Sequence, residues 1–191
     1  MLDNKINEIK KLVKDKSFDQ ALNYINENIS KDDQNETILQ YLGFIQLNLG
    51  DKQKALFHYK KALEINSKNV VSLLAIAKIL NLGKQNEESL TYILKAYKLD
   101  PENESVIFPL ARLYRELKRY NEAIQFFNKI KSKTFYEYSQ LNLAEIYALL
   151  NQVPLAISKY EVYLKLNKKN SSAYLSLGNL YKKLNKIPTA I

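Results

Sequence analysis

Apolar residues recur along this chain with helical spacing, in segments that come in pairs. In residues 36–69 the first segment carries its apolar side chains at Leu39, Leu42, Ile45 and Leu49, and the second carries them at Ala55, Leu56, Tyr59, Ala62 and Leu63. Intervals of three and four residues place each set on one face of a helix. A polar turn at 50–52 separates the segments, and its Gly50 is suited to a left-handed helix end. The pattern predicts two amphipathic helices joined by a short turn.

The two-helix pattern repeats at an interval of 34 residues, shortened once to 33. Six rows follow, and they begin at Leu2, Glu36, Val70, Glu104, Glu137 and Ser171. Such a period is typical of repeat proteins, in which each repeat is one supersecondary unit. We therefore expect a single domain over residues 1–191, made of repeats 2–35, 36–69, 70–103, 104–136 and 137–170 and an incomplete sixth, 171–191.

Small and large residues occupy fixed columns in these rows. One small column lies on the first helices, at Gly43, Ala77, Ala111, Ala144 and Gly178. A second lies on the second helices, at Ala21, Ala55, Ser89, Ala123, Ala156 and Ala190. A large column accompanies it, at Ile25, Tyr59, Ile93, Phe127 and Tyr160. We expect the paired helices to approach closely at the small residues while the large side chains fill the space beside them.

Prolines mark the helix boundaries. Pro101 is expected to end a helix before the next row, and Pro154 and Pro188 to begin second helices, where a missing N–H costs nothing. Pro109 falls early in a first helix and predicts a late start or a kink. The first row places Glu8 and Ile9 where the small-residue pair belongs, so its first helix is expected to be a more solvated cap.

The fourth row ends with FNKIKSKTF (127–135), lacks the alanine, acid and proline of other rows, and is one residue short. We expect altered packing there and a change in curvature.

The pattern resembles the tetratricopeptide repeat (TPR), and the residues that carry the resemblance are LG at 42–43, Ala55, Tyr59, Ala62 and the helix-ending LDPEN (99–103). The resemblance covers nearly the whole chain. The resemblance implies an all-α fold, a helix-turn-helix solenoid wound into a right-handed superhelix, with five full repeats and a truncated sixth. One helix pair cannot bury both of its apolar faces, which is why such units stack. This chain departs from the family where a bulky aromatic is expected early in the first helix, and it has Leu39, Leu73, Ile107 and Gln140 there before Tyr174.

Composition narrows the possible chemistry. The chain has only four Gly and four Pro. It has no Cys, and this absence excludes disulfides and thiolate metal sites. Its start lacks the apolar core of a signal peptide. The longest apolar-rich run, 70–80, is far shorter than the ~20 residues of a membrane span. These features predict a cytoplasmic protein. The net charge of +9 is compatible with an acidic partner, with a nucleic acid, or with no specific role.

No set of catalytic residues is apparent. His58 is the only histidine and has no second His or Cys with which to bind zinc. No phosphate-binding loop, nucleophile elbow or zinc-protease motif occurs. We therefore expect no enzyme activity, catalytic residue, metal or cofactor.

The resemblance implies that first helices line a concave groove in which ligands lie. The groove residues are then Gln40, Phe44, Asn48, Lys78, Asn81, Phe108, Arg112, Arg115, Tyr138, Asn142, Glu145, Asn179 and Lys182, with Lys10 and Lys14 in the first row. A central cluster is expected from Lys78, Asn81, Arg112 and Arg115. Positive groups outnumber acids, so an extended acidic or C-terminal segment is the expected ligand, with arginine forks on carboxylates and asparagine amides on the peptide backbone.

The leading hypothesis is a noncatalytic scaffold that binds a peptide or partner protein. Alternatives are an RNA-binding helical repeat protein, which the columns do not favour, and the N-terminal regulatory arm of a larger enzyme such as a transferase. The Lys-Asn, Asn and Lys-Arg set by which some TPR domains hold a chaperone C-terminus is missing from any three consecutive rows. The unfinished last row indicates a fragment of a longer protein, or an open end that pairs with something, including a second copy.

Overall fold

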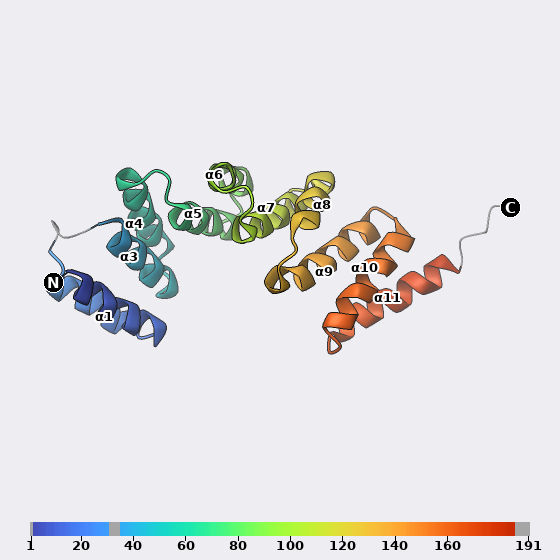
Figure 1. Cartoon of the computed structure of the whole chain (residues 1–191), viewed down its shortest axis with the longest axis horizontal. Helices are drawn as coiled ribbons and strands as arrows, with labels where there is room; N and C mark the ends of the chain where they lie inside the picture. Colours follow the sequence, from blue (N-terminus) through green and yellow to red (C-terminus); the bar gives the residue numbers. More distant parts are fainter. Residues whose placement is uncertain (1, 31–34, 186–191) are drawn as a thin grey trace. The chain divides into compact units, whose positions relative to one another are not determined.

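The computed structural model describes residues 2–30 and 35–185, and within these ranges it contains eleven α-helices and no strand (Figure 1). The helices are α1 (Leu2–Lys14), α2 (Phe18–Asn28), α3 (Glu36–Asn48), α4 (Lys52–Ile65), α5 (Val70–Leu82), α6 (Asn86–Leu99), α7 (Glu104–Glu116), α8 (Tyr120–Lys129), α9 (Lys133–Leu149), α10 (Val153–Leu166) and α11 (Ser171–Leu184). The all-α prediction is confirmed.

The chain forms two compact units, Met1–Leu99 and Asp100–Ile191. In the first unit the helices contact one another as the pairs α1 with α2, α3 with α4, and α5 with α6. In the second unit α7 contacts α8, and α9 contacts α10. Successive pairs also touch within each unit, through α4 with α5 in the first and through α8 with α9 in the second. Figure 1 shows the hairpin of α9 and α10 as two neighbouring ribbons joined by a short turn.

First helices begin at the first residue of their rows, with one exception. That exception is α9, which begins at Lys133 instead of Glu137 and runs for 17 residues. The preceding α8 is only 10 residues long and ends at Lys129. The short fourth row therefore has a shorter second helix, and the next first helix gains a turn at its start. That added turn contributes to the site described below.

The expected small and large columns form the contacts between paired helices. The large column is buried throughout, from Ile25 to Tyr160, and the described members of the small column on second helices are 0% exposed. At the third pair, Ser89 replaces alanine, and its hydroxyl donates a 2.7 Å hydrogen bond to the carbonyl of Ala77 in the facing column. Gly178 differs because it is exposed, and a β-carbon there would meet nothing within 4 Å. Ala190 lies outside the described residues.

The turns inside the hairpins all use a left-handed residue at the same place. Gly50 has φ of 91°, as predicted. The equivalent positions are occupied by residues with a side chain, and their φ values are 57° at Lys16, 62° at Lys84, 59° at Lys118 and 59° at Asn151. A left-handed conformation costs an L-residue roughly 1–2 kcal/mol relative to a right-handed one. The fold therefore imposes this strain in four turns where glycine would relieve it.

Asparagine side chains cap the starts of four first helices. Their carboxamide oxygens accept hydrogen bonds from backbone N–H groups two or three residues later, at Asn35, Asn69, Asn103 and Asn170. A cap of this kind contributes about 1 kcal/mol. Asparagine one residue before the row start is thus a repeated signal for the first helices, in addition to their apolar spacing.

The prolines behave largely as expected. Pro101 lies in the turn after α6, and Pro154 is the second residue of α10. Pro109 lies inside α7, which Asn103 caps and which begins at Glu104. Of the two predicted alternatives, the late start is wrong and the kink stays a prediction. Pro188 lies outside the described residues. In α1 only Ile9 is buried, so the more solvated first helix is confirmed.

Glutamates at row starts connect the two ends of a repeat. Glu36 accepts a 2.9 Å hydrogen bond from the side-chain amide of Asn69, and Glu137 accepts one of 2.7 Å from Asn167. Each bond joins a row-start residue on a first helix, the first residue of α3 or the fifth of α9, to the segment that follows the second helix of the same repeat. Val70 stands at this position in the third row, so that repeat lacks the contact.

The fourth repeat has the most extensive version of this connection. The carboxylate of Glu104 accepts hydrogen bonds from the backbone N–H of Lys131 at 2.8 Å, the backbone N–H of Ser132 at 3.0 Å, and the Ser132 hydroxyl. The Ser132 hydroxyl, followed by these backbone donors, lowers the pKa of Glu104 below its usual value of 4.5. Glu104 thereby fixes the segment between the short α8 and the early α9.

Candidate functional site

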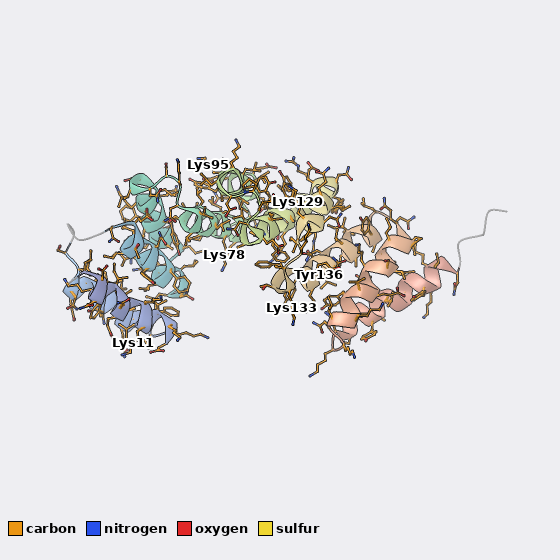
Figure 2. All side chains as sticks on the ribbon, viewed as in Figure 1. Lys11, Lys78, Lys95, Lys129, Lys133 and Tyr136 are labelled. Atoms are coloured by element: carbon orange, nitrogen blue, oxygen red, sulfur yellow. The ribbon has the colours of Figure 1, made fainter. Side chains whose placement is uncertain are left out.

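The first unit carries five of the predicted groove residues on α3 and α5, and the two predicted lysines of the first row, Lys10 and Lys14, on α1. The Phe44 ring lies edge-on to Phe18, with ring centroids 6.0 Å apart. The Asn48 side-chain amide donates to the backbone carbonyl of Phe44 at 2.8 Å, and that of Asn81 donates to Asn86 at 3.2 Å. Gln40 is half-buried and Lys78 is exposed. Figure 2 shows Lys78 on α5 and Lys95 on α6 on opposite sides of their hairpin.

The second unit brings six predicted groove residues together around one pocket of about 540 Å³. They are Phe108, Arg112 and Arg115 from α7 and Tyr138, Asn142 and Glu145 from α9. Of the expected central cluster, Arg112 and Arg115 therefore line this pocket, whereas Lys78 and Asn81 belong to the other unit. Asn179 and Lys182 are exposed on α11 and do not line it.

Three further lining residues, Thr134, Phe135 and Leu141, were not among the predicted groove residues. Thr134 and Phe135 lie in the added first turn of α9, which begins at Lys133. The signal that could have identified them is the helical spacing of Phe135 and Tyr138, which continues the apolar stripe of α9 back across the row boundary.

One side of the pocket is aromatic. The Phe108 ring stacks on Phe135 at a centroid distance of 5.1 Å and an interplanar angle of 24°, and it lies edge-on to Tyr138 at 6.5 Å. Behind it, Phe108 also meets the edge of Phe127, which is 0% exposed. A fully buried ring therefore supports Phe108, while Phe135 and Tyr138 remain open to a ligand. Such a wall suits an apolar side chain.

The other side of the pocket holds a hydrogen-bonded polar group. Arg115 donates through Nη1 to a Glu145 carboxylate oxygen at 2.6 Å and to the Asn142 carboxamide oxygen. The Asn142 amide donates in turn to the backbone carbonyl of Tyr138 at 2.7 Å, and Asn142 is only 8% exposed. Arg115 and Asn142 thus already have partners inside the chain, unlike the ligand-facing roles expected for them.

Arg112 lies in a different setting. Its side chain is 58% exposed, and its ion pair with Glu116 on the same helix is 3.8 Å long. Surface pairs of this length contribute about 0–1 kcal/mol. Two arginines and one glutamate line the pocket, so its local charge is positive, and Arg112 is the cation best placed to meet a ligand.

A second pocket, of about 440 Å³, lies between α10 and α11 and was not predicted. Its lining residues are Glu161, Leu164, Lys165, Lys168, Tyr174 and Leu177. Tyr181 donates from its hydroxyl to Glu161 at 2.5 Å. Tyr174 is 49% exposed, although the residues in its column in the four preceding rows are 1–6% exposed. The expected pairing through this end of the chain stays a prediction.

His58 shows a packing role. It is half-buried on α4, edge-on to Phe57 with centroids 5.3 Å apart, and burial lowers its pKa, with a smaller effect from nearby Lys54. Across residues 2–30 and 35–185, no three His, Asp or Glu side chains are grouped to hold a metal. In the same ranges no helix is both long enough and apolar enough to cross a bilayer.

Comparison with known proteins supports the repeat architecture. Family models described as tetratricopeptide repeat match residues 37–69, and residues 70–103 and 106–132. No curated protein matches the chain.

Solved structures match over almost the whole chain. A tetratricopeptide repeat protein from Parabacteroides merdae is 20% identical, with a TM-score of 0.76 over 97% of this chain and 74% of its own. The Pseudomonas aeruginosa protein pilF is 20% identical, with a TM-score of 0.81 over 96% of this chain and 84% of its own. MamA from Desulfovibrio magneticus is 16% identical, with a TM-score of 0.77 over 89% of this chain and 97% of its own. At these identities the likeness concerns the fold. Taken with the family matches and the buried columns, it shows that the chain belongs to the tetratricopeptide repeat family.

Proposed function

We propose that this protein is a noncatalytic scaffold that binds a peptide segment of a partner protein, and that the pocket between α7 and α9 is one of its binding sites. TPR proteins in general are protein-interaction scaffolds. The observation that carries the proposal is the meeting, in one pocket, of the aromatic side chains of Phe108, Phe135 and Tyr138 with the exposed guanidinium of Arg112. An apolar wall beside a cation is the chemistry that recognises an apolar residue next to a carboxylate.

Two features support a protein ligand over a nucleic acid. Glu145 lines the pocket, and its carboxylate opposes the closely spaced charges of a phosphate backbone more than it opposes a ligand with a single carboxylate. Phe108 and Phe135 stack on each other, so their faces are not both available as platforms for bases. The arguments for RNA are the net charge of +9 and the use of helical-pair repeats of similar length to read single strands. The cytoplasmic location and the attachment of this chain to a larger enzyme stay predictions.

Selection from a random peptide library displayed on phage tests the proposal. Peptides selected on the immobilised chain should carry an acidic residue beside an aromatic or long aliphatic residue. Arg112→Gln should weaken them about tenfold, because one charge-assisted hydrogen bond is lost at a part-exposed site. Lys183→Gln on α11 removes the same charge at an exposed residue that lies outside both this pocket and the predicted groove, and it should leave affinity unchanged.

Equal loss in both variants would show that only net charge matters. Affinity that survives both Arg112→Gln and Phe108→Ala would place binding elsewhere. An oligouridine added to the same assay at two salt concentrations covers the RNA alternative, which predicts displacement of the peptide and a steep salt dependence.

A further inference from the structure

We infer that Glu145 restricts the pocket between α7 and α9 to ligands with a single carboxylate, which binds at Arg112. This inference rests on the proposed function and specifies the ligand of the same site. It follows from the different settings of the two arginines. The guanidinium of Arg115 lies 2.6 Å from the carboxylate of Glu145 on α9, whereas that of Arg112 lies 3.8 Å from the carboxylate of Glu116 on its own helix.

The contact between Arg115 and Glu145 joins α7 to α9 and is supported by Asn142 on α9. Glu145 lies one turn after Asn142 on α9, and Asn142 accepts from the same Arg115 nitrogen while its amide is held by the Tyr138 carbonyl. The side chains of Arg115 and Glu145 are 35% and 38% exposed, so solvent screens the pair less than it screens Arg112. The guanidinium of Arg115 is thus oriented toward α9, with its charge compensated there.

A ligand with two carboxylates gains little from its second charge in this arrangement. The first can bind Arg112 while an apolar side chain contacts Phe108 and Phe135. The second would approach Arg115 and meet the like charge of Glu145, which is 2.6 Å from the guanidinium. Like charges at close range oppose binding, and this opposition is a means of specificity. The geometry favours one acidic residue adjacent to one apolar residue, and disfavours an acidic run.

Removing the Glu145 charge should change this preference. In Glu145→Gln the amide oxygen still accepts from Arg115, so the contact between helices is kept while the charge of Arg115 becomes available. A second carboxylate then finds an uncompensated guanidinium. Glu102→Gln is the matched control, because Glu102 is exposed in the same unit, lies outside the pocket, and loses the same charge.

The experiment uses three amidated peptides that carry a neutral fluorophore: GSNFSG with no acid, GSDFSG with one, and GSDFDG with two. Fluorescence anisotropy on the intact chain gives their affinities. In the unmodified protein, GSDFSG should bind about tenfold more tightly than GSNFSG, and GSDFDG should bind within about twofold of GSDFSG. In Glu145→Gln, GSDFDG should become about tenfold tighter than GSDFSG, and in Glu102→Gln it should not.

A double variant keeps the result interpretable. Arg115→Gln combined with Glu145→Gln leaves a neutral pair and should abolish the gain for GSDFDG, which assigns that gain to Arg115. A tenfold advantage of GSDFDG in the unmodified protein would overturn the inference. So would an equal gain in Glu102→Gln, or no gain in a folded Glu145→Gln. If none of the three peptides binds the unmodified protein, the proposed function fails together with the inference.

Discussion

The ring of Tyr59 packs directly against Gly43, and a β-carbon at residue 43 would lie 2.8 Å from the Tyr59 Cε2 atom. This contact joins α3 to α4 and accounts for the small residue at position 43. Burial raises the pKa of Tyr59 to about 12, so the phenol remains neutral across the range in which the protein is handled. The chain therefore needs glycine at this position because of the side chain that faces it.

Substitution of the two column glycines should have opposite effects. Gly43→Ala forces the Tyr59 ring to move, at a cost of roughly 1–3 kcal/mol, which exceeds the ~1 kcal/mol that alanine gains as a helix former. Gly178→Ala meets no atom within 4 Å and should stabilise by about 0.5–1 kcal/mol. Urea unfolding followed by circular dichroism measures both. Similar changes of one sign in the two variants would contradict this explanation of the column.

The left-handed turns give a second pair of opposed variants. Lys84→Gly should stabilise the protein by about 0.5–1 kcal/mol, because glycine adopts φ of 62° without the steric cost that lysine has there. Gly50→Ala should destabilise by about 1 kcal/mol, because alanine has to adopt φ of 91°. The unfolding midpoint in urea reports both changes. A loss of stability in Lys84→Gly would mean that the lysine side chain stabilises its turn by more than the backbone strain costs.

Glu104 predicts a dependence of stability on pH. Its pKa is lower in the folded chain than the usual 4.5, so its contribution is fully present above pH 4.5 and is lost as pH falls through the lower folded value. The difference in unfolding free energy between the unmodified protein and Glu104→Gln should therefore be largest near pH 6 and shrink below pH 4.5. Glu102→Gln provides a control at a nearby exposed position. A difference that stays constant from pH 6 to pH 3 would rule out this role.

Much of the fold could be predicted from the sequence because residues with the same structural role recur at equivalent positions of several repeats. A single alanine at position 55 says little, but small residues at Ala55, Ser89, Ala123 and Ala156 identify a helix contact, and all are 0% exposed. The exceptions occur where local chemistry overrides the period. The early start of α9 is such an exception. The helix begins at Lys133 because no proline or side-chain cap between Lys133 and Glu137 delays its start.

The candidate site was predicted only in part. The resemblance assigned Phe108, Arg112 and Tyr138 to one face of the first helices, and the structure brings all three together around one pocket. That they bind a ligand stays a prediction. Spacing does not reveal which side chains bond to each other. Arg115 and Glu145 are 30 residues apart, and their ion pair depends on side-chain conformations that a face assignment does not specify. The left-handed conformation of Lys84 was not predicted either. Glycine is the usual residue with a positive φ, and the glycine beside it, Gly83, would have been the expected choice.

The most direct test of the binding pocket is an NMR titration of the isotopically labelled chain with the peptide GSDFSG. We expect the largest chemical-shift changes on α7 and the first half of α9, including Phe108, Phe135 and Leu141. At a peptide concentration well below saturation, we expect these changes to be about tenfold smaller in Arg112→Gln. Shifts confined to the first unit, or shifts that persist unchanged in Arg112→Gln, would contradict binding at this pocket.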